Sequence, residues 1–407
     1  MKKIIIVVCL IALSISAWFI LPKQINLSEG TQSLDELVTA LMIEAAIPGL
    51  AIAKVTNGEV SFIDTYGKAN IETGLDVTHD TQFNIASISK PIMGIALLRL
   101  VDQGKLDLDS DINDYLSFHI NNPKVENEKI TIRHLASHSS GIDDYYDIDS
   151  YSENKDPETT LKQHLKSLLT KSGNKYENGI YFLESKSGEF RKYSNLAAGL
   201  AGQIVEEVTG STLAEYSNAE LFGLLGMRNA SWRLNDLKLN NIAVPYEVKQ
   251  CIPYIFICAN TESSITNHII GQYFNPPIEN KQFLPYPHFG NPQYPDGGIR
   301  ASIKEMSQLL VSVLKNEDSS GNQLLSDEAY NEMFKLQLPP DVSSNQRFFW
   351  RDRNGLTGHM GSDLGVFTSI YFDMNSKTGF IILMNRGADA KAGEAMQKIV
   401  SSLIENE

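Results

Sequence analysis

A serine and a lysine stand three residues apart at Ser87 and Lys90, at the start of a helix predicted over 88–102. About one helical turn separates the two side chains, so both lie on one face of the helix. A desolvated lysine amine can accept the serine proton, and the helix N-terminus favours negative charge near the reacting oxygen. The pair therefore predicts a serine nucleophile that is activated by a lysine.

The Ser-x-x-Lys spacing is weak evidence by itself, because it also occurs at 152–155 and 312–315. A helix-capping serine followed by a solvated lysine would give the same letters. Ser87 differs from the other two serines because its helix is apolar on nearly all sides, which is typical of a buried helix. A reactive pair at the mouth of a buried helix is the more specific interpretation.

Several short sequence motifs follow one another along the chain on both sides of Ser87. They are Ile47 to Ala51, Thr81 to Lys90, Gly104 to Asp109, Ile132 to Gly141, Tyr193 to Asn195, Leu221 to Met227 and Gly297 to Ser302. Together they resemble the serine β-lactamase-like superfamily, above all its class C β-lactamase, D-Ala-D-Ala carboxypeptidase and β-lactamase-like esterase branch. The resemblance covers nearly everything from about Leu34 to Arg386. It implies acyl transfer through a covalent serine ester.

The second element of that family is Tyr-x-Asn, in which a phenol relays protons and an amide orients the lysine and the substrate. The resemblance assigns it to Tyr193 and Asn195, which precede a helix predicted over 196–209. The same letters at 216–218 lie within a predicted helix and indicate a packing tyrosine. Those at 176–178 lie in a polar loop.

The third family element is Lys-Thr-Gly, or His-x-Gly in some branches, on a strand beside the site. Lys377 begins such a triplet, but it lies in a turn between two predicted strands. His359 stands one strand earlier, at the family's position. The resemblance therefore implies a role for His359, and an oxyanion hole formed by the backbone N–H groups of Ser87 and Ser362.

Residues near His359 are expected to contact the substrate, namely Met360 and Gly361, together with Arg300. Met360 stands where the family often has a threonine or serine that binds a substrate carboxylate, and a thioether cannot donate that hydrogen bond. Protonated His359, Arg300 or the Ser362 hydroxyl could compensate. The site therefore fits a D-Ala-D-Ala peptidase or β-lactamase, or an esterase or amidase for uncharged acyl substrates.

Charge and composition limit the classes of partner. The 407 residues carry a net charge of −14, which argues against nucleic acid, because phosphate neutralisation needs clustered lysine and arginine. We expect no metal or organic cofactor. The acidic run 107–111 lacks the glycine and final glutamate of a calcium loop, and His134 and His138 are not expected to be ligands. The expected partner is a small-molecule or peptide substrate, and the oligomeric state stays open.

The N-terminus predicts export. Two lysines precede an apolar run over 4–21, so 1–22 reads as a signal peptide or as an uncleaved membrane anchor. The protein is therefore expected to be periplasmic or extracellular. Cys251 and Cys258 are close enough to form a disulfide in an oxidising compartment, with metal binding as the weaker alternative.

The order of predicted elements indicates an α/β (α+β) fold of the β-lactamase/transpeptidase-like type, with an antiparallel sheet flanked by helices. We expect the sheet domain to combine 30–108 with 296–407, and a mostly helical domain to be inserted over 109–246. The segment 247–295 reads as an irregular insert near the site. A non-catalytic exported protein that binds peptide or glycan in the same cleft is the rival from another class. Retention of Ser87, Lys90, Tyr193 and Asn195 together argues against it.

Overall fold

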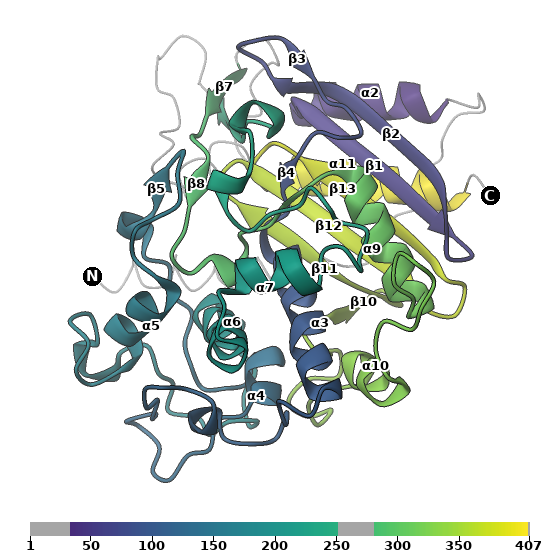
Figure 1. Cartoon of the computed structure of the whole chain (residues 1–407). Helices are drawn as coiled ribbons and strands as arrows, with labels where there is room; N and C mark the ends of the chain where they lie inside the picture. The colour runs from purple at the N-terminus through teal and green to yellow at the C-terminus, as the bar shows by residue number, and fades with distance from the viewer. Residues whose placement is uncertain (1–32, 251–280, 406–407) are drawn as a thin grey trace, which may run out of the picture.

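The computed structural model describes residues 33–250 and 281–405, and its largest element is a seven-stranded antiparallel sheet. The strand order is β10-β11-β12-β13-β1-β2-β3, so strands from both ends of the chain lie side by side (Figure 1). The strands are β1 (Gly49–Thr56), β2 (Glu59–Asn70), β3 (Leu75–Asp76), β10 (Arg351–Arg353), β11 (Leu356–Asp363), β12 (Val366–Asp373) and β13 (Thr378–Met384).

The centre of the sheet is the antiparallel pair of β1 and β13, in which Leu50 is opposite Met384. Successive side chains of a strand point to opposite faces. Ala51 and Ala53 accordingly enter the larger of two hydrophobic clusters, whereas Leu50 and Ile52 enter the smaller one. Both faces of the sheet are therefore buried at its centre.

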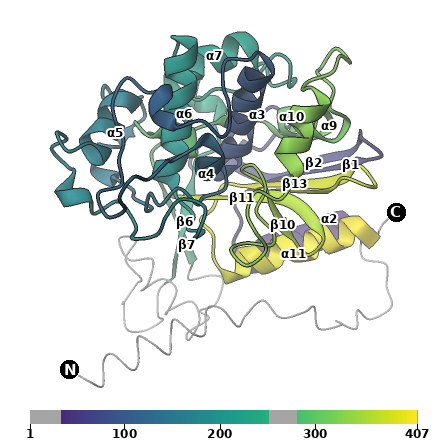
Figure 2. The same cartoon turned by 90° about the horizontal axis from the view of Figure 1, so that it is seen from below.

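Two helices from opposite ends of the chain cover one face of the sheet (Figure 2). They are α2 (Leu34–Ala45) and α11 (Ala390–Glu405), which pack against each other over the smaller cluster. On the other face, α9 (Ile303–Lys315) packs against β1, β2 and β13. This arrangement confirms the predicted antiparallel sheet flanked by helices.

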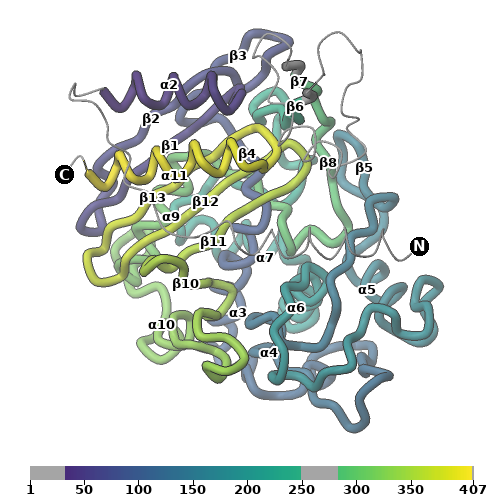
Figure 3. The backbone as a smooth tube through the Cα atoms, turned by 180° about the vertical axis from the view of Figure 1, so that it is seen from behind, coloured from purple at the N-terminus to yellow at the C-terminus, as the bar shows by residue number. Residues whose placement is uncertain are grey.

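The other helices gather beside the sheet, around the buried α3, as Figure 3 shows from behind. Their buried side chains belong to the same larger hydrophobic cluster as side chains of the sheet, so these helices and the sheet share a core. The helices are α3 (Ser89–Asp102), α4 (Ile132–Ala136), α5 (Leu161–Leu169), α6 (Asn195–Thr209), α7 (Leu213–Glu220) and α10 (Asp327–Phe334). Short 3-10 helices are η1 (Ala86–Ile88), η2 (Ile112–Asp114), η3 (Ile148–Ser150), η4 (Glu177–Gly179), η5 (Leu234–Asp236), η6 (Leu239–Asn241) and η8 (Tyr294–Asp296).

Three two-stranded pairs complete the described structure: β4 (Phe83–Asn84) with β9 (Arg300–Ala301), β5 (Ser152–Glu153) with β8 (Phe289–Gly290), and β6 (Tyr246–Gln250) with β7 (Lys281–Pro285). The segment 247–295, expected to be irregular, thus contains strands at both of its described ends. Cys251 and Cys258 lie outside the described residues, as does the predicted signal or anchor over 1–22. Within the described ranges, no helix is long and apolar enough to cross a bilayer.

One strand begins later in the structure than the sequence predicts. The sequence pattern predicts a strand over 347–351, but Phe348, Phe349 and Trp350 are all buried in the larger cluster and β10 begins only at Arg351. Consecutive strand residues alternate between faces, so three of them cannot all enter one core from an extended strand. Phe349 has φ 56°, which bends the chain and lets its N–H donate to the carbonyl of Ala136.

Candidate active site

Ser87 lies on a tight turn that leads from β4 into η1 and α3. Ala86, directly before it, has φ 47°, a left-handed conformation that is costly for a residue with a Cβ. The Asn84 side-chain oxygen accepts the Ala86 N–H at 2.8 Å and holds this conformation. The turn places Ser87 at the start of the helical turn, where backbone N–H groups lack helical partners.

Strand β11 runs directly against this turn, and Gly361 makes the close approach possible. A Cβ on Gly361 would lie 2.3 Å from both the Ile85 carbonyl oxygen and Thr368 Oγ1. Thr368, on β12, also donates a hydrogen bond of 3.0 Å to the Ile85 carbonyl. Strands β11 and β12 are therefore fixed to the chain just before Ser87. Gly361 contributes space here, and it does not line the pocket described below.

Lys90 is fully buried, and its amine has three oxygen neighbours. Nζ lies 2.9 Å from Ser87 Oγ and 2.6 Å from Asn195 Oδ1, and it also contacts the Asp296 carbonyl oxygen. The ring of Tyr193 lies beside it, with 5.0 Å between Nζ and the ring centroid. Each of these oxygens is formally neutral, so the described residues supply Lys90 with no carboxylate in contact.

Asn195 begins α6, whose N-cap is Ser194; the Ser194 hydroxyl accepts the Ala197 N–H at 3.0 Å. The Asn195 side-chain nitrogen donates to Asp144 Oδ1 and Oδ2 at 3.1 and 3.2 Å. The Asn195 backbone N–H donates to Asp144 Oδ1 at 2.8 Å. The amide is thus held between the Asp144 carboxylate on one side and Lys90 on the other.

His138 holds the chain around Tyr193 from three directions. Its ring packs against the Tyr193 ring at a tilt of 36°, with 4.3 Å between centroids. Its carbonyl accepts the Lys192 N–H at 2.9 Å, and its Nδ1 accepts the Ser194 N–H at 3.3 Å. Burial lowers the pKa of His138 well below its usual value, so the ring is neutral. Its Nε2 is buried and has no hydrogen-bond partner among the described residues.

His359 faces the same group from β11, and its ring centroid lies 6.3 Å from that of Tyr193. Its Nδ1 is 2.7 Å from the Met360 carbonyl oxygen, which can only accept, so Nδ1 carries the proton and Nε2 offers a lone pair. Burial, and next the charge of Lys90, lower the pKa of His359 to about 3. A protonated His359 at neutral pH, one of the expected carboxylate binders, therefore does not fit this structure.

A pocket of about 370 Å³ opens beside Ser87. Arg300 and Ser362 line it, as do aromatic side chains at Tyr146, Tyr151 and Phe289. The guanidinium of Arg300 is buried and donates to the Gly298 and Phe289 carbonyl oxygens at 2.5 and 2.6 Å. Each of its two terminal nitrogens therefore donates one hydrogen bond to the protein, whereas Nε has no hydrogen-bond partner among the described residues.

Two carboxyl groups, Asp296 and Asp363, also line the pocket. Burial is the main cause that raises the pKa of both, for Asp296 to about 7. The Asp296 side chain accepts a 2.8 Å hydrogen bond from Gln293, and Asp363 accepts one of 3.2 Å from Asn84. The pocket lining therefore includes two carboxyl groups.

Met360 is not part of this pocket. It packs against the smaller cluster, and its sulfur lies 3.2 Å from Arg353 Nη1. His359 and Met360 are neighbours on β11, so their side chains point to opposite faces. The expected contact of the Met360 side chain with substrate is not supported by this placement.

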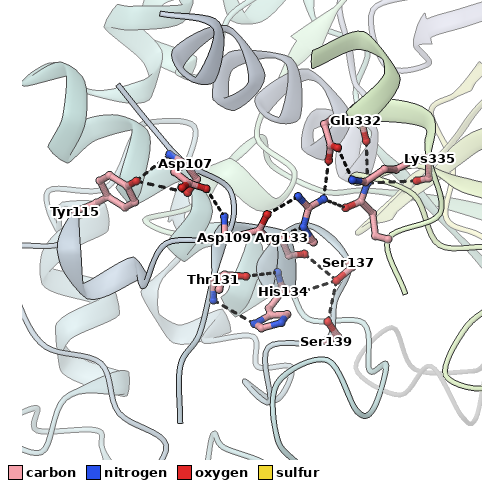
Figure 4. A network of polar contacts seen from close by, with 11 residues as sticks. Asp107, Asp109, Tyr115, Thr131, Arg133, His134, Ser137, Ser139, Glu332 and Lys335 are labelled. Atoms are coloured by element: carbon pink, nitrogen blue, oxygen red, sulfur yellow. Dashed lines mark hydrogen bonds and ion pairs between the residues drawn. The ribbon is translucent and has the colours of Figure 1, made fainter. Parts of the chain in front are cut away.

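Tyr216 and Lys377, which begin further copies of the Tyr-x-Asn and Lys-Thr-Gly letters, lie in other elements than the site residues. Tyr216 is buried within α7, and Lys377, with φ 51°, lies in the turn between β12 and β13. Asp109, in the acidic run, is bound to Arg133 at 2.7 Å (Figure 4). No group of three or more possible metal ligands occurs in the described part of the chain.

The sequence interpretation missed three residues that contact the motifs: His138, Asp144 and Asp296. His138 was considered only as a metal ligand, and Asp144 lies 51 positions before Asn195, so no local spacing connects these two residues. Asp296 contributes through its carbonyl, which any residue could supply. Of these three residues, only His138 had a signal in the sequence, because it lies within the family-like motif Ile132 to Gly141.

Comparison with known proteins gives a match along most of the chain. The profile of the Beta-lactamase family matches residues 34–401. Protein flp of Staphylococcus aureus (strain MRSA252) is 26% identical over 274 residues, or 64% of this chain and 52% of that protein. Esterase EstB of Burkholderia gladioli is 29% identical over 230 residues, or 54% of this chain and 55% of EstB. The chain thus aligns with about half the length of these curated relatives.

Among solved structures, the penicillin binding protein from Bacillus halodurans superposes with a TM-score of 0.65. The match covers 89% of this chain and 98% of that one, at 21% sequence identity. At this identity the likeness is one of fold. It confirms the β-lactamase/transpeptidase-like fold that the motifs implied.

Proposed function

The chain belongs to the Beta-lactamase family, and from this premise we propose that it is a serine hydrolase that acts through a covalent acyl-Ser87 intermediate. Lys90, Tyr193, Asn195 and His359 would assist Ser87. The name of one relative, Esterase EstB, supports an ester as one type of substrate.

The contacts of Lys90 are the observation that carries this proposal. To act as a base Lys90 must first lose a proton, and the neutral amine then has two N–H bonds and one lone pair. Asn195 Oδ1 and the Asp296 carbonyl can only accept, so they take both N–H bonds. The lone pair then remains for the third neighbour, Ser87, whose hydroxyl lies 2.9 Å away. This arrangement suits proton transfer from Ser87 to Lys90.

In the proposed reaction, Ser87 Oγ attacks the acyl carbonyl carbon and its proton passes to Lys90. The tetrahedral species collapses when the bond to the leaving group breaks, and Tyr193 relays a proton to that group. Water then attacks the acyl ester, and the carboxylic acid leaves as Ser87 regains its proton. His359, neutral and with Nε2 as an acceptor, assists by hydrogen bonding.

The backbone N–H groups of Ser87 and Ser362 are proposed as the oxyanion hole. Asp363 and Val366 close a two-residue hairpin, so the next pair, Ser362 and Phe367, is a non-hydrogen-bonded one. The Ser362 N–H therefore points away from β12. Ser362 and Ser87 line the same pocket, which supports this assignment.

Among substrate types, we favour acyl groups that carry no carboxylate. Asp296 and Asp363 line the pocket, Arg300 is engaged by two carbonyl oxygens, and Met360 packs away from it. A D-Ala-D-Ala peptidase or β-lactamase is the alternative, and it would require Arg300 or the Ser362 hydroxyl to bind the carboxylate. Export is likewise proposed, on the N-terminal sequence alone.

The test is intact-mass analysis of the purified protein after mixing with p-nitrophenyl butyrate or benzylpenicillin. We expect a butyryl adduct on the wild type, none on Ser87→Ala, and an unchanged adduct on Ser152→Ala, the serine of another Ser-x-x-Lys. A penicilloyl adduct that depends on Ser87 would instead favour the peptidase or lactamase alternative. Equal adducts on the wild type and Ser87→Ala would refute Ser87 as the nucleophile.

A further inference from the structure

The orientation of the Asn195 amide decides what Lys90 meets. An amide presents an acceptor oxygen at one end and a donor NH2 group at the other. With the oxygen toward Lys90, the amide accepts one N–H bond of the lysine, as the 2.6 Å contact indicates. With the NH2 group toward Lys90, the amide would compete with Ser87 for the lysine lone pair.

Asp144 selects between these two orientations. Its carboxylate can only accept, and it receives the Asn195 NH2 group at 3.1 and 3.2 Å and the Asn195 backbone N–H at 2.8 Å. The reversed amide would place its oxygen against the carboxylate, where two acceptors repel. The side chain of Asp144 thus acts on Lys90 without touching it.

We propose that Asp144 is a positioning residue, which fixes the Asn195 amide so that the lone pair of Lys90 stays available to Ser87. The inference rests on the proposed acyl-Ser87 chemistry. It extends the reacting group by one residue beyond the family motifs, into the segment after α4.

A simpler role for Asp144 is helix capping. Its carboxylate lies at the N-terminus of α6, where negative charge is favoured. Capping predicts a loss of stability and leaves the chemistry at Ser87 unchanged. A positioning role predicts a slower acylation step, and this loss must disappear once the Asn195 amide is removed.

The test uses Asp144→Asn, which keeps the shape of the side chain but supplies a donor that can accommodate the reversed amide. The matched control is Asp143→Asn, the adjacent residue with the same change of charge, whose carboxylate pairs with Lys192 at 2.5 Å and not with Asn195. Rapid mixing with p-nitrophenyl butyrate gives the acylation rate constant and KM. Thermal unfolding of each variant measures stability.

We expect Asp144→Asn to lower the acylation rate constant about tenfold or more, the size of a lost hydrogen bond to a charged group. KM should stay within about threefold, and Asp143→Asn within about twofold of the wild type in both constants. In an Asn195→Ala background, Asp144→Asn should change the rate by less than about twofold, because the coupled partner is gone.

Two results would overturn the inference: Asp144→Asn acylating as fast as Asp143→Asn, or a loss of the same size with and without Asn195. Asp144→Ala, which leaves the amide without a fixed acceptor, gives the same comparison if Asp144→Asn does not fold. Failure of the proposed function looks different, because the wild type itself would then form no adduct on Ser87.

Discussion

Lys90 and Arg133 are both held by several oxygens, but the oxygens differ in kind. Lys90 is fully buried and contacts a hydroxyl, an amide oxygen and a carbonyl oxygen. Arg133 binds the carboxylates of Asp109 at 2.7 and 2.8 Å and of Glu332 at 2.6 Å, and the Gln337 amide at 2.7 Å (Figure 4).

The carboxylates around Arg133 stabilise its positive charge and occupy its N–H groups. Its hydrogen bond to Asp109 is the main cause that raises the pKa of Arg133 further. The network joins α4 to α10 and serves the fold. Around Lys90, the atoms in contact with the amine are neutral acceptors that orient it, and no carboxylate of the described residues contacts it. A buried basic group thus becomes a candidate catalyst when its contacts orient it without forming an ion pair.

Lys90→Met tests the role of the Lys90 amine most directly, because it keeps the buried side-chain stem and removes the amine. We expect the acylation rate constant to fall about a thousandfold, within the range of a lost general base. Pre-steady-state release of p-nitrophenol measures it, and thermal unfolding checks that the variant folds. A variant that acylates within tenfold of the wild type would show that another group takes the Ser87 proton.

Arg133→Met should have the opposite profile. We expect a loss of about 1–3 kcal/mol in the free energy of unfolding, because charge-assisted hydrogen bonds are lost from a partly buried group. The acylation rate constant should stay within about twofold. Urea unfolding measures the free energy of unfolding, and rapid mixing measures the acylation rate constant. Lys304→Met serves as a surface control, because Lys304 pairs with the exposed Asp80. A large rate loss in a stable Arg133→Met would contradict the division between the two regions.

Lowering the pH should destabilise the two regions in different pH ranges. The pKa of His359 is lowered from 6.5 to about 3, so the unfolded chain binds its proton first and stability falls as pH drops from 6.5. His359→Gln should therefore lose less stability than the wild type between pH 7 and 5, by about 2 kcal/mol. Urea unfolding at both pH values measures this difference; equal losses would indicate a solvated His359.

The Arg133 network responds only at lower pH. Its hydrogen bond to Asp109 lowers the pKa of that carboxyl below 3.8, so this stabilisation is complete above that value and lost as pH falls through the folded pKa. The stability difference between the wild type and Arg133→Met should thus be constant from pH 7 to 5 and shrink below about pH 4.

The sequence predicted the members of the site better than their environment. Ser87, Lys90, Tyr193, Asn195 and His359 stand in short words whose order resembles a known family, and the structure brings them together; their roles remain predictions. The partners that orient them depend on tertiary contacts between distant segments.

Two particular misses show the physical limit. Met360 was expected beside the substrate, but whether it faces the pocket depends on which face of β11 is turned to Ser87. The apolar letters of Phe348 to Trp350 suited a strand as well as a core segment. Only the left-handed Phe349 and the surrounding cluster distinguish the two.

The pairing of β1 with β13 also sets an order of events during synthesis. Leu50 leaves the ribosome long before Met384, its partner across the strands, so the middle of the sheet must wait for most of the chain. Closing so long a loop is entropically costly and slow. The serine on its helix is made early, but β11, which must lie against the turn before it, is made late. A nascent chain therefore carries its nucleophile for most of its synthesis without the strand that completes the site.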